Sequence, residues 1–172
     1  MMFLLEVKDM NEKVAYFAGG CFWCITPIFV ARGANKVVAG YSGGDEENPT
    51  YKDVKSQKTG HRETIAIYYD ENRISYDKLL KIFLSNIDPY DPDGQFIDRG
   101  YSYSTAIYYT NEEEHNKALD NIEELEKQSG KKIEVKLEAF KSFWPAEEYH
   151  QDYYLKNPEA FEKELIESGR KK

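Results

Sequence analysis

Two cysteines, Cys21 and Cys24, are the residues best suited to chemistry, and they are the only thiols in the chain. They lie in the run Gly19-Gly20-Cys21-Phe22-Trp23-Cys24, between a predicted strand and an apolar stretch that predicts a helix. Unpaired N–H groups and the dipole of a helix N-terminus favour a thiolate, and they can lower a cysteine pKa from about 8.5 to roughly 3.5–7.5. The pair therefore predicts thiol redox chemistry, with Cys21 as the reactive thiol.

The dipeptide Thr26-Pro27 leaves the start of this helix open. Threonine often caps a helix, and proline favours the first helical position. Cys21 then lies either at the helix start or in a turn ahead of it.

Three other interpretations of the pair stay open at this point. Both cysteines can be small core side chains. They can also be half of a zinc site, although His61, His115 and His150 show no matched short spacing. The third alternative is a thioredoxin-like thiol-disulfide oxidoreductase, because Cys-X-X-Cys beside a βαβ pattern is typical of that class. Against it, Phe-Trp is a bulky intervening pair, and no X-Pro begins a later predicted strand.

Length, charge and cysteine usage limit the class of protein. A chain of 172 residues fits one domain with a core of its own. The start MMFLLEVKDM lacks the basic and apolar regions of a signal peptide, and the apolar runs are too short for a membrane span. The net charge of −8 disfavours nucleic acid. A cysteine pair of this kind suits a reducing compartment, so we expect a cytoplasmic protein. We also expect a monomer that binds neither a membrane nor a metal and needs no cofactor.

Hydrophobic periodicity predicts alternating strands and helices. Strands are expected at residues 13–18, 37–41, 64–69, 105–109 and 133–137. Ser75 is expected to cap a helix with apolar positions from Tyr76 to Ile87, and Thr110 with Glu113 to form a capping box for a helix that Gly130 closes. Short helices are expected after Pro145. This order predicts an α+β fold, a two-layer sandwich with a mixed sheet and packed helices.

Several separated motifs then follow in a recognisable order. These are Gly20-Cys21-Phe22-Trp23, Gly40-Tyr41-Ser42-Gly43-Gly44, Asn48-Pro49-Thr50-Tyr51, Gly60-His61-Arg62-Glu63, Asp98-Arg99-Gly100-Tyr101-Ser102-Tyr103 and Ala146-Glu147-Glu148-Tyr149-His150-Gln151. In these blocks the sequence resembles the A-type peptide methionine sulfoxide reductases. The resemblance implies a ferredoxin-like core at about residues 14–158, within a single catalytic domain of residues 1–172.

The resemblance implies methionine S-sulfoxide as substrate, free or in oxidised proteins that the enzyme repairs. The Cys21 thiolate would attack the sulfoxide sulfur, and the oxygen must gain protons because it cannot leave as a bare oxyanion. Glu63 matches the family's catalytic glutamate, whose pKa an apolar site would raise. Tyr51 and Tyr103 match tyrosines that hydrogen-bond the sulfoxide oxygen. Taken alone, a glutamate at such a turn is usually solvated and such tyrosines are mostly packing residues, so only the whole set of motifs favours these roles.

The same resemblance implies the rest of the substrate pocket. Phe22 and Trp23 would hold the substrate methyl group against an aromatic face. Asp98 matches a polar pocket residue. We expect His150 to be structural and leave it out of the catalytic set.

Cys24 is implied as the resolving thiol, because a sulfenic acid on Cys21 condenses with a nearby thiol to a disulfide. Thioredoxin or a similar dithiol would reduce a small strained loop disulfide of this kind. Many family members instead carry resolving cysteines in a C-terminal tail, but the tail of this chain contains no cysteine. Other departures from the family pattern are Thr26, Ser102 and Ser104, which affect the shape of the pocket.

Overall fold

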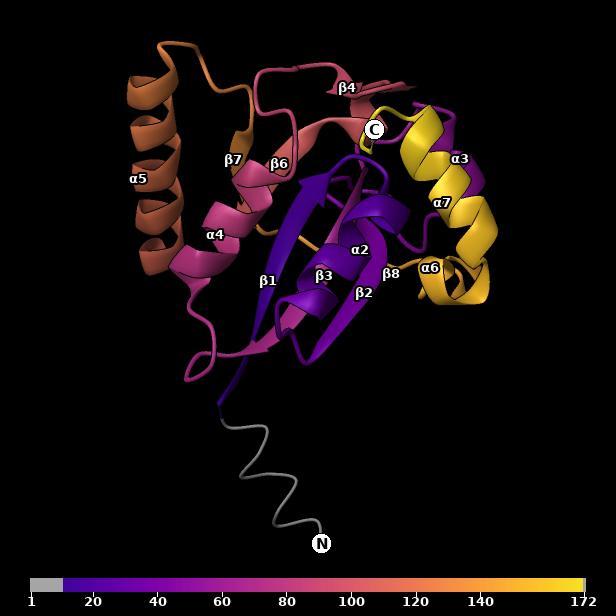
Figure 1. The fold of residues 1–172 in the computed structure, drawn as a ribbon, viewed down its shortest axis with the longest axis horizontal. Coiled ribbons are helices and arrows are strands. Elements are labelled where there is room, and N and C mark those ends of the chain that lie inside the picture. The colour runs from indigo at the N-terminus through magenta and orange to yellow at the C-terminus, as the bar shows by residue number, and fades with distance from the viewer. Residues whose placement is uncertain (1–10, 172) are drawn as a thin grey trace, which may run out of the picture.

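The structure is a computed structural model that describes residues 11–171, and a six-stranded sheet forms its centre (Figure 1). Residues 1–10, for which the sequence predicts neither a signal peptide nor a membrane span, lie outside the described residues. The strands of the sheet are β1 (Glu12–Gly19), β2 (Lys36–Ser42), β3 (Arg62–Asp70), β6 (Thr105–Tyr109), β7 (Lys136–Ala139) and β8 (Phe143–Pro145). A separate two-stranded ribbon consists of β4 (Gly94–Gln95) and β5 (Asp98–Arg99).

The helices pack mainly on one face of this sheet. They are α2 (Phe22–Ala31), α3 (Tyr51–Lys55), α4 (Tyr76–Ser85), α5 (Glu112–Ser129), α6 (Tyr153–Lys156) and α7 (Pro158–Glu167), with 3-10 turns η1 (Tyr101–Tyr103) and η2 (Glu148–His150). Figure 1 shows α2 and α4 across the sheet, α5 beyond α4 at one side, and α7 beyond α2 at the other. Within the described part of the chain, no helix combines the length and the apolar content of a membrane span.

The strand order is β7-β6-β1-β3-β2-β8. Every neighbouring pair is antiparallel except β6 and β7, which are parallel, so the sheet is mixed as predicted. Its four central strands with α2 and α4 form the βαββαβ arrangement of a ferredoxin-like core. The predicted α+β fold is therefore confirmed.

Strand alternation decides which side chains meet the helices. Phe17, Ile65, Ile67 and Ile107 share the large core with α2 and α4. Tyr16, Ala18, Ala106 and Tyr108 turn to the other face, where Phe140 packs against them. Glu63 is in phase with Ile65 and Ile67 on β3, so alternation places its carboxyl on the helix side of the sheet.

The start of α2 decides between the two sequence alternatives for Cys21. The helix begins at Phe22, Cys21 is the residue directly before it, and Pro27 lies inside the helix. Thr26 does not cap the helix, because its Oγ1 donates to the carbonyl of Phe22, 2.7 Å away, one turn earlier.

The structure confirms the predicted cap of α4 but not that of α5. Ser75 caps α4 as expected, since its hydroxyl accepts the N–H of Lys78 at 3.1 Å. The capping box predicted at Thr110 and Glu113 is wrong by one residue. Asn111 is the cap, its Oδ1 accepts the N–H of Glu114 at 2.9 Å, and the Glu114 carboxylate accepts the N–H of Thr110 at 2.7 Å.

The strand predicted at residues 133–137 begins three residues later, as β7 (Lys136–Ala139). Ile133 and Val135 are buried as a strand pattern requires. However, the N–H of Glu134 donates to the carbonyl of Pro89 at 2.7 Å, so this stretch bonds to the loop after α4 instead of the sheet. The predicted closure of α5 is confirmed, because Gly130 adopts φ +69°.

Candidate active site

The turn between β1 and α2 presents Cys21 at a helix N-terminus. Gly20 has φ +86°, a left-handed backbone conformation that favours glycine. It lets the chain turn sharply from the strand into the helix. The Cys24 N–H then donates to the Cys21 carbonyl at 3.1 Å, which closes the first turn.

The two thiols lie together beneath the surface. Both are free, with exposed fractions of 6% for Cys21 and 2% for Cys24. Their side chains are hydrogen-bonded to each other, and this contact, followed by burial, raises the pKa of Cys21 well above its ordinary value. The same hydrogen bond lowers the pKa of Cys24; burial opposes this shift and Arg170 supports it.

This order of acidity corrects the expectation from the helix N-terminus. Helix position alone predicts the thiolate at Cys21, whereas the structure places the more acidic thiol at Cys24. The main reason is the hydrogen bond between the two thiols, which favours the proton on Cys21 and the charge on Cys24; burial and the charges of Glu63 and Asp98 also oppose ionisation of Cys21. The two thiols therefore titrate as a pair, which loses its first proton more easily and holds its second more tightly than isolated thiols would.

Glu63 lies at the end of β3 that faces the start of α2. Its side chain is only 2% exposed, and its Oε1 accepts the N–H of Phe22 at 3.1 Å. Burial raises the pKa of this carboxyl to about 8, although the bond from Phe22 lowers it. Glu63 is thus mainly protonated at neutral pH and can donate a proton beside Cys21.

Two tyrosines approach Glu63 from separate elements. Tyr51 begins α3 and Tyr103 ends η1. Burial, and after it the charge of Glu63, raises the pKa of Tyr51 to about 12 and shifts Tyr103 in the same direction. The two phenols also interact with each other. Both O–H groups stay protonated at neutral pH and can act as hydrogen-bond donors.

An aromatic wall continues from Phe22 and Trp23. Phe22 is only 1% exposed, while Trp23 is half-buried and stacks on Tyr153 with ring centroids 4.0 Å apart. The Trp23 Nε1–H donates to Nδ1 of His150 at 3.0 Å. Trp23 is therefore fixed in orientation by Tyr153 and His150.

His150 is a site residue that sequence reasoning set aside as structural. Its ring centroid lies 4.4 Å from that of Tyr51 and 5.1 Å from that of Phe22, so it packs between the aromatic wall and the tyrosine. Burial lowers its pKa. Because Nδ1 accepts from Trp23, the neutral ring carries its proton on Nε2, which is buried without a partner among the described residues.

Asp98 enters from β5, next to the thiols. Burial raises the pKa of its carboxyl, while Arg170 and Lys55 lower it. Its Oδ2 is buried and has no hydrogen-bond partner within residues 11–171. Asp98 is therefore a second carboxyl near Cys21, in a position to accept a hydrogen bond from a bound molecule.

Glu147 supports the site from the C-terminal part of the chain. Its Oε1 accepts the hydroxyl of Tyr41 at 2.8 Å, and its Oε2 accepts the N–H of Tyr51 at 2.9 Å. The bond to the Tyr51 N–H holds the backbone of the first residue of α3, so Glu147 helps to position the Tyr51 side chain. No signal in the local sequence separates this role from a solvated glutamate.

Ser102 and Ser104, the two serines that depart from the family pattern, both form hydrogen bonds to side chains of other segments of the chain. Ser102 donates its N–H to Gln57 Oε1 at 2.9 Å and accepts the Gln57 amide at 2.7 Å. Ser104 accepts from Arg62 Nε at 2.8 Å. They hold η1, and through it Tyr103, in place.

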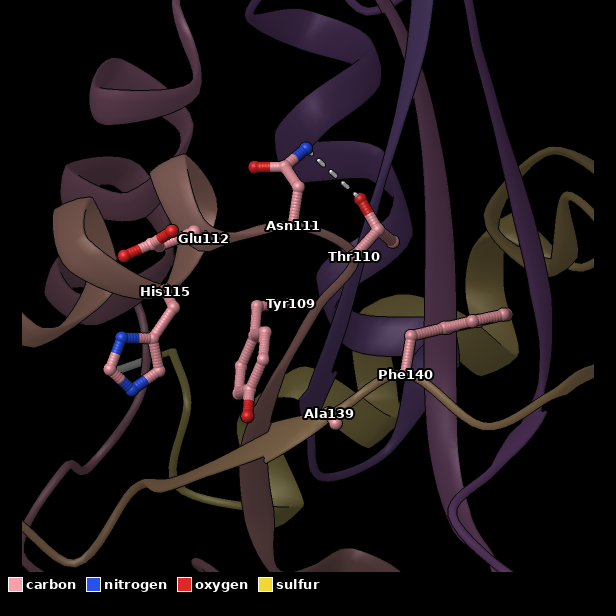
Figure 2. A pocket seen from close by; sticks show the side chains of 7 residues that line it. All are labelled: Tyr109, Thr110, Asn111, Glu112, His115, Ala139 and Phe140. Carbon is pink, nitrogen blue, oxygen red and sulfur yellow. Dashed lines mark hydrogen bonds between the residues drawn. The ribbon is translucent and has the colours of Figure 1, made fainter.

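A different hollow, of about 490 Å³, lies near the N-terminus of α5 (Figure 2). Figure 2 shows His115 beside Tyr109, with ring centroids 4.8 Å apart, and a long bond of 3.5 Å from Asn111 to Thr110. Neither cysteine nor Glu63 lines it. In the described part of the chain, no group of three or more His, Cys, Asp or Glu side chains is arranged to hold a metal ion.

Comparison with known proteins places these features in a family. A family model described as peptide methionine sulfoxide reductase matches residues 13–172. The peptide methionine sulfoxide reductase MsrA of Picrophilus torridus is 48% identical over 151 residues, which is 86% of this chain and 85% of that protein. That of Halalkalibacterium halodurans is 48% identical over 160 residues, 91% and 90% of the two chains.

Solved structures with the same fold include two of Mxr1 from Saccharomyces cerevisiae. Reduced Mxr1 of Saccharomyces cerevisiae superposes with a TM-score of 0.82 at 27% identity, covering 87% of each chain. Mxr1 in complex with Trx2 gives a TM-score of 0.57 at 18% identity, covering 84% of this chain and 86% of that one.

Proposed function

Since the chain belongs to the peptide methionine sulfoxide reductases and is an oxidoreductase, we propose that it reduces the S epimer of methionine sulfoxide, with Cys21 as nucleophile. The predicted family, rather than the thioredoxin-like alternative, is thereby confirmed. The observation that carries the proposal is the buried Glu63 carboxyl held against the start of α2, beside Cys21, where burial raises its pKa to about 8. Free methionine sulfoxide and oxidised proteins are the proposed substrates, and protein repair is the proposed role.

The first step transfers one oxygen atom. The Cys21 proton moves to the Cys24 sulfur, and the Cys21 thiolate attacks the sulfoxide sulfur, while Glu63 protonates the oxygen. The sulfur–oxygen bond of the substrate breaks, methionine leaves, and Cys21 becomes a sulfenic acid. The sulfoxide sulfur is reduced and the Cys21 sulfur is oxidised, so no further oxidant or reductant is needed.

The surrounding residues support charge development at that oxygen. Tyr51 and Tyr103 supply two phenol donors whose raised pKa values keep them protonated. Donors already aimed at the oxygen stabilise the transition state without reorganisation. Trp23 and Phe22 offer aromatic surface for the substrate methyl group, and Asp98 offers a polar contact.

The second step regenerates the thiols. Cys24 attacks the sulfenic sulfur of Cys21, a disulfide forms, and water leaves. A protein dithiol such as thioredoxin then reduces the disulfide. The complex of yeast Mxr1 with Trx2 supports this choice of reductant for the chain.

The proposed unit is a single catalytic domain spanning residues 1–172 that acts as a monomer in the cytoplasm. All the proposed reacting groups come from one chain, and a reducing compartment supplies the dithiol. Sedimentation of the active protein as a monomer is the expected result, and activity only in a larger species would refute it.

An epimer-resolved turnover assay tests the function. The protein and the Cys21→Ser variant are incubated with dithiothreitol and with each epimer of methionine sulfoxide, and methionine is quantified. We expect methionine from the S epimer with the intact protein only. Turnover of the R epimer alone, or equal turnover by Cys21→Ser, would refute the proposal.

A further inference from the structure

The end of the chain returns to the turn that carries Cys21. After α7 the backbone turns through Gly169, with φ +87°, and the yellow ribbon beyond α7 leads back toward the start of α2 (Figure 1). Arg170 Nη2 donates to the carbonyl of Gly19 at 2.9 Å. Its guanidinium also lies over the ring of Phe96, 4.8 Å from the centroid. Residues 151 positions apart in the sequence are thereby joined at the active-site turn.

Gly20 makes this approach possible. A Cβ at position 20 would lie 2.7 Å from Arg170 Nη2 and equally close to Gln95. Any other residue would therefore push Arg170 or Gln95 away from the turn. The glycine before Cys21 has a second function besides its backbone conformation: it leaves room for a cation.

Arg170 and Cys24 share one hollow. The hollow has a volume of about 380 Å³, and Cys24, Pro27, Phe161 and Arg170 are among its lining residues. Arg170 Nε is buried and has no hydrogen-bond partner among the described residues. A cation with an unused donor therefore lies on the same hollow as the second thiol, in largely apolar surroundings where a charge acts strongly.

The charges that face Cys24 come from several elements. Besides Cys21, they are Glu63 of β3, Asp98 of β5, Glu164 of α7 and Arg170. The bond from Cys21 lowers the pKa of Cys24 most and burial opposes it; Arg170 lowers the pKa, whereas Asp98 and Glu164 raise it. Arg170 is thus the cation of an otherwise acidic set.

We propose that Arg170 is a positioning residue for disulfide formation, whose guanidinium holds negative charge on the Cys24 sulfur beside Cys21. The inference rests on the proposed function, because it concerns the step after oxygen transfer. In that step the Cys24 thiolate gives an electron pair to the sulfenic sulfur of Cys21. The S–S bond forms and the S–O bond breaks, and the proton that Cys24 gives up on becoming a thiolate joins the departing hydroxide to form water.

The same charge assists the return half of the cycle. When an external dithiol attacks the Cys21 sulfur, the Cys24 sulfur is the leaving group, and a thiol of lower pKa leaves faster. One arginine therefore favours both formation and reduction of the disulfide, through the same stabilised thiolate.

A thiolate titration tests the inference without any substrate. In a Cys21→Ser background, absorbance near 240 nm follows ionisation of Cys24 with and without Arg170→Met, which keeps side-chain length but removes charge. We expect the midpoint to rise by about one pH unit, so that at a pH below it the thiolate fraction falls about tenfold. Arg170→Lys should restore most of the loss, and Lys163→Met, which removes an exposed cation of α7 outside the hollow, should titrate like its parent. An unchanged midpoint in Arg170→Met would overturn the inference.

Rapid-quench kinetics with Cys21 intact separate this inference from the proposed function. With S-sulfoxide as substrate, methionine and disulfide are quantified over a range of pH. In Arg170→Met, disulfide formation should slow about tenfold more than methionine formation, with its pH profile moved upward. If the unmodified protein forms no methionine, the proposed function fails, and the titration still decides the role of Arg170. If it turns over and Arg170→Met keeps the same disulfide pH profile, only the inference fails.

Discussion

The buried carboxyl of Glu63 makes stability depend on pH in a way that one substitution should remove. Its pKa rises from an ordinary value of 4.5 to about 8 in the folded protein. Folding therefore favours the protonated form, so this contribution to stability is fully present below about pH 4.5 and is lost as the pH rises to about 8. The Glu63→Gln variant would have no such dependence, because an amide does not ionise in this range.

The size of this contribution to the free energy of unfolding follows from the interval between the two pKa values of Glu63. About 3.5 pH units, at about 1.36 kcal/mol each, correspond to roughly 5 kcal/mol. The unfolding free energy of Glu63→Gln minus that of the unmodified protein should therefore rise by several kcal/mol between pH 5 and pH 8. Urea unfolding at a series of pH values measures this difference.

A matched substitution separates the site from a general effect of removing a glutamate. Glu123 is exposed on α5, away from the cysteines, and Glu123→Gln should show a difference that stays nearly flat with pH. A flat difference for Glu63→Gln as well would refute the claim that this carboxyl is protonated by burial. Activity provides a second readout: kcat/KM should fall above about pH 8 as Glu63 ionises, and Glu63→Gln should lose on the order of 10²–10⁴-fold.

Other substitutions test the remaining contacts. Tyr103→Phe removes a phenol donor beside Glu63, so steady-state assays with S-sulfoxide should show a kcat lower by on the order of 10²-fold. An unchanged kcat would exclude Tyr103 as a donor to the sulfoxide oxygen. Trp23→Phe loses the bond to His150, and KM for the sulfoxide should rise about tenfold, whereas an unchanged KM would count against the aromatic wall. Ser75→Ala removes the cap of α4, and urea unfolding should show a loss of about 1 kcal/mol with activity unchanged. A stability loss near zero would mean that the hydroxyl is not needed there.

The parts of the site that lie on regular elements were predictable from the sequence. Alternation along β3 gives Glu63 the same face as Ile65 and Ile67, and that face meets the helices. For Glu63, local periodicity and the two-layer fold are enough. For Cys21 the sequence left two places open because of Thr26-Pro27, and only the structure selects the position directly before the helix.

The parts that depend on distant segments were not predictable in this way. Trp23 meets His150 across 127 positions and Gly19 meets Arg170 across 151, and no local pattern sets such contacts. The order of acidity of the two thiols was also missed. It depends on the hydrogen bond between the two thiols and on the charges around each sulfur, which helix position alone does not specify.

The central claim is that the Cys21 sulfur takes the oxygen from the substrate. The most direct measurement mixes Cys24→Ser protein with equimolar S-sulfoxide and a sulfenic-acid trap, then locates the trapped residue by mass spectrometry. The account predicts about one methionine per protein molecule and the trap on Cys21. A trap on another residue, or methionine formed with Cys21 unmodified, would contradict it.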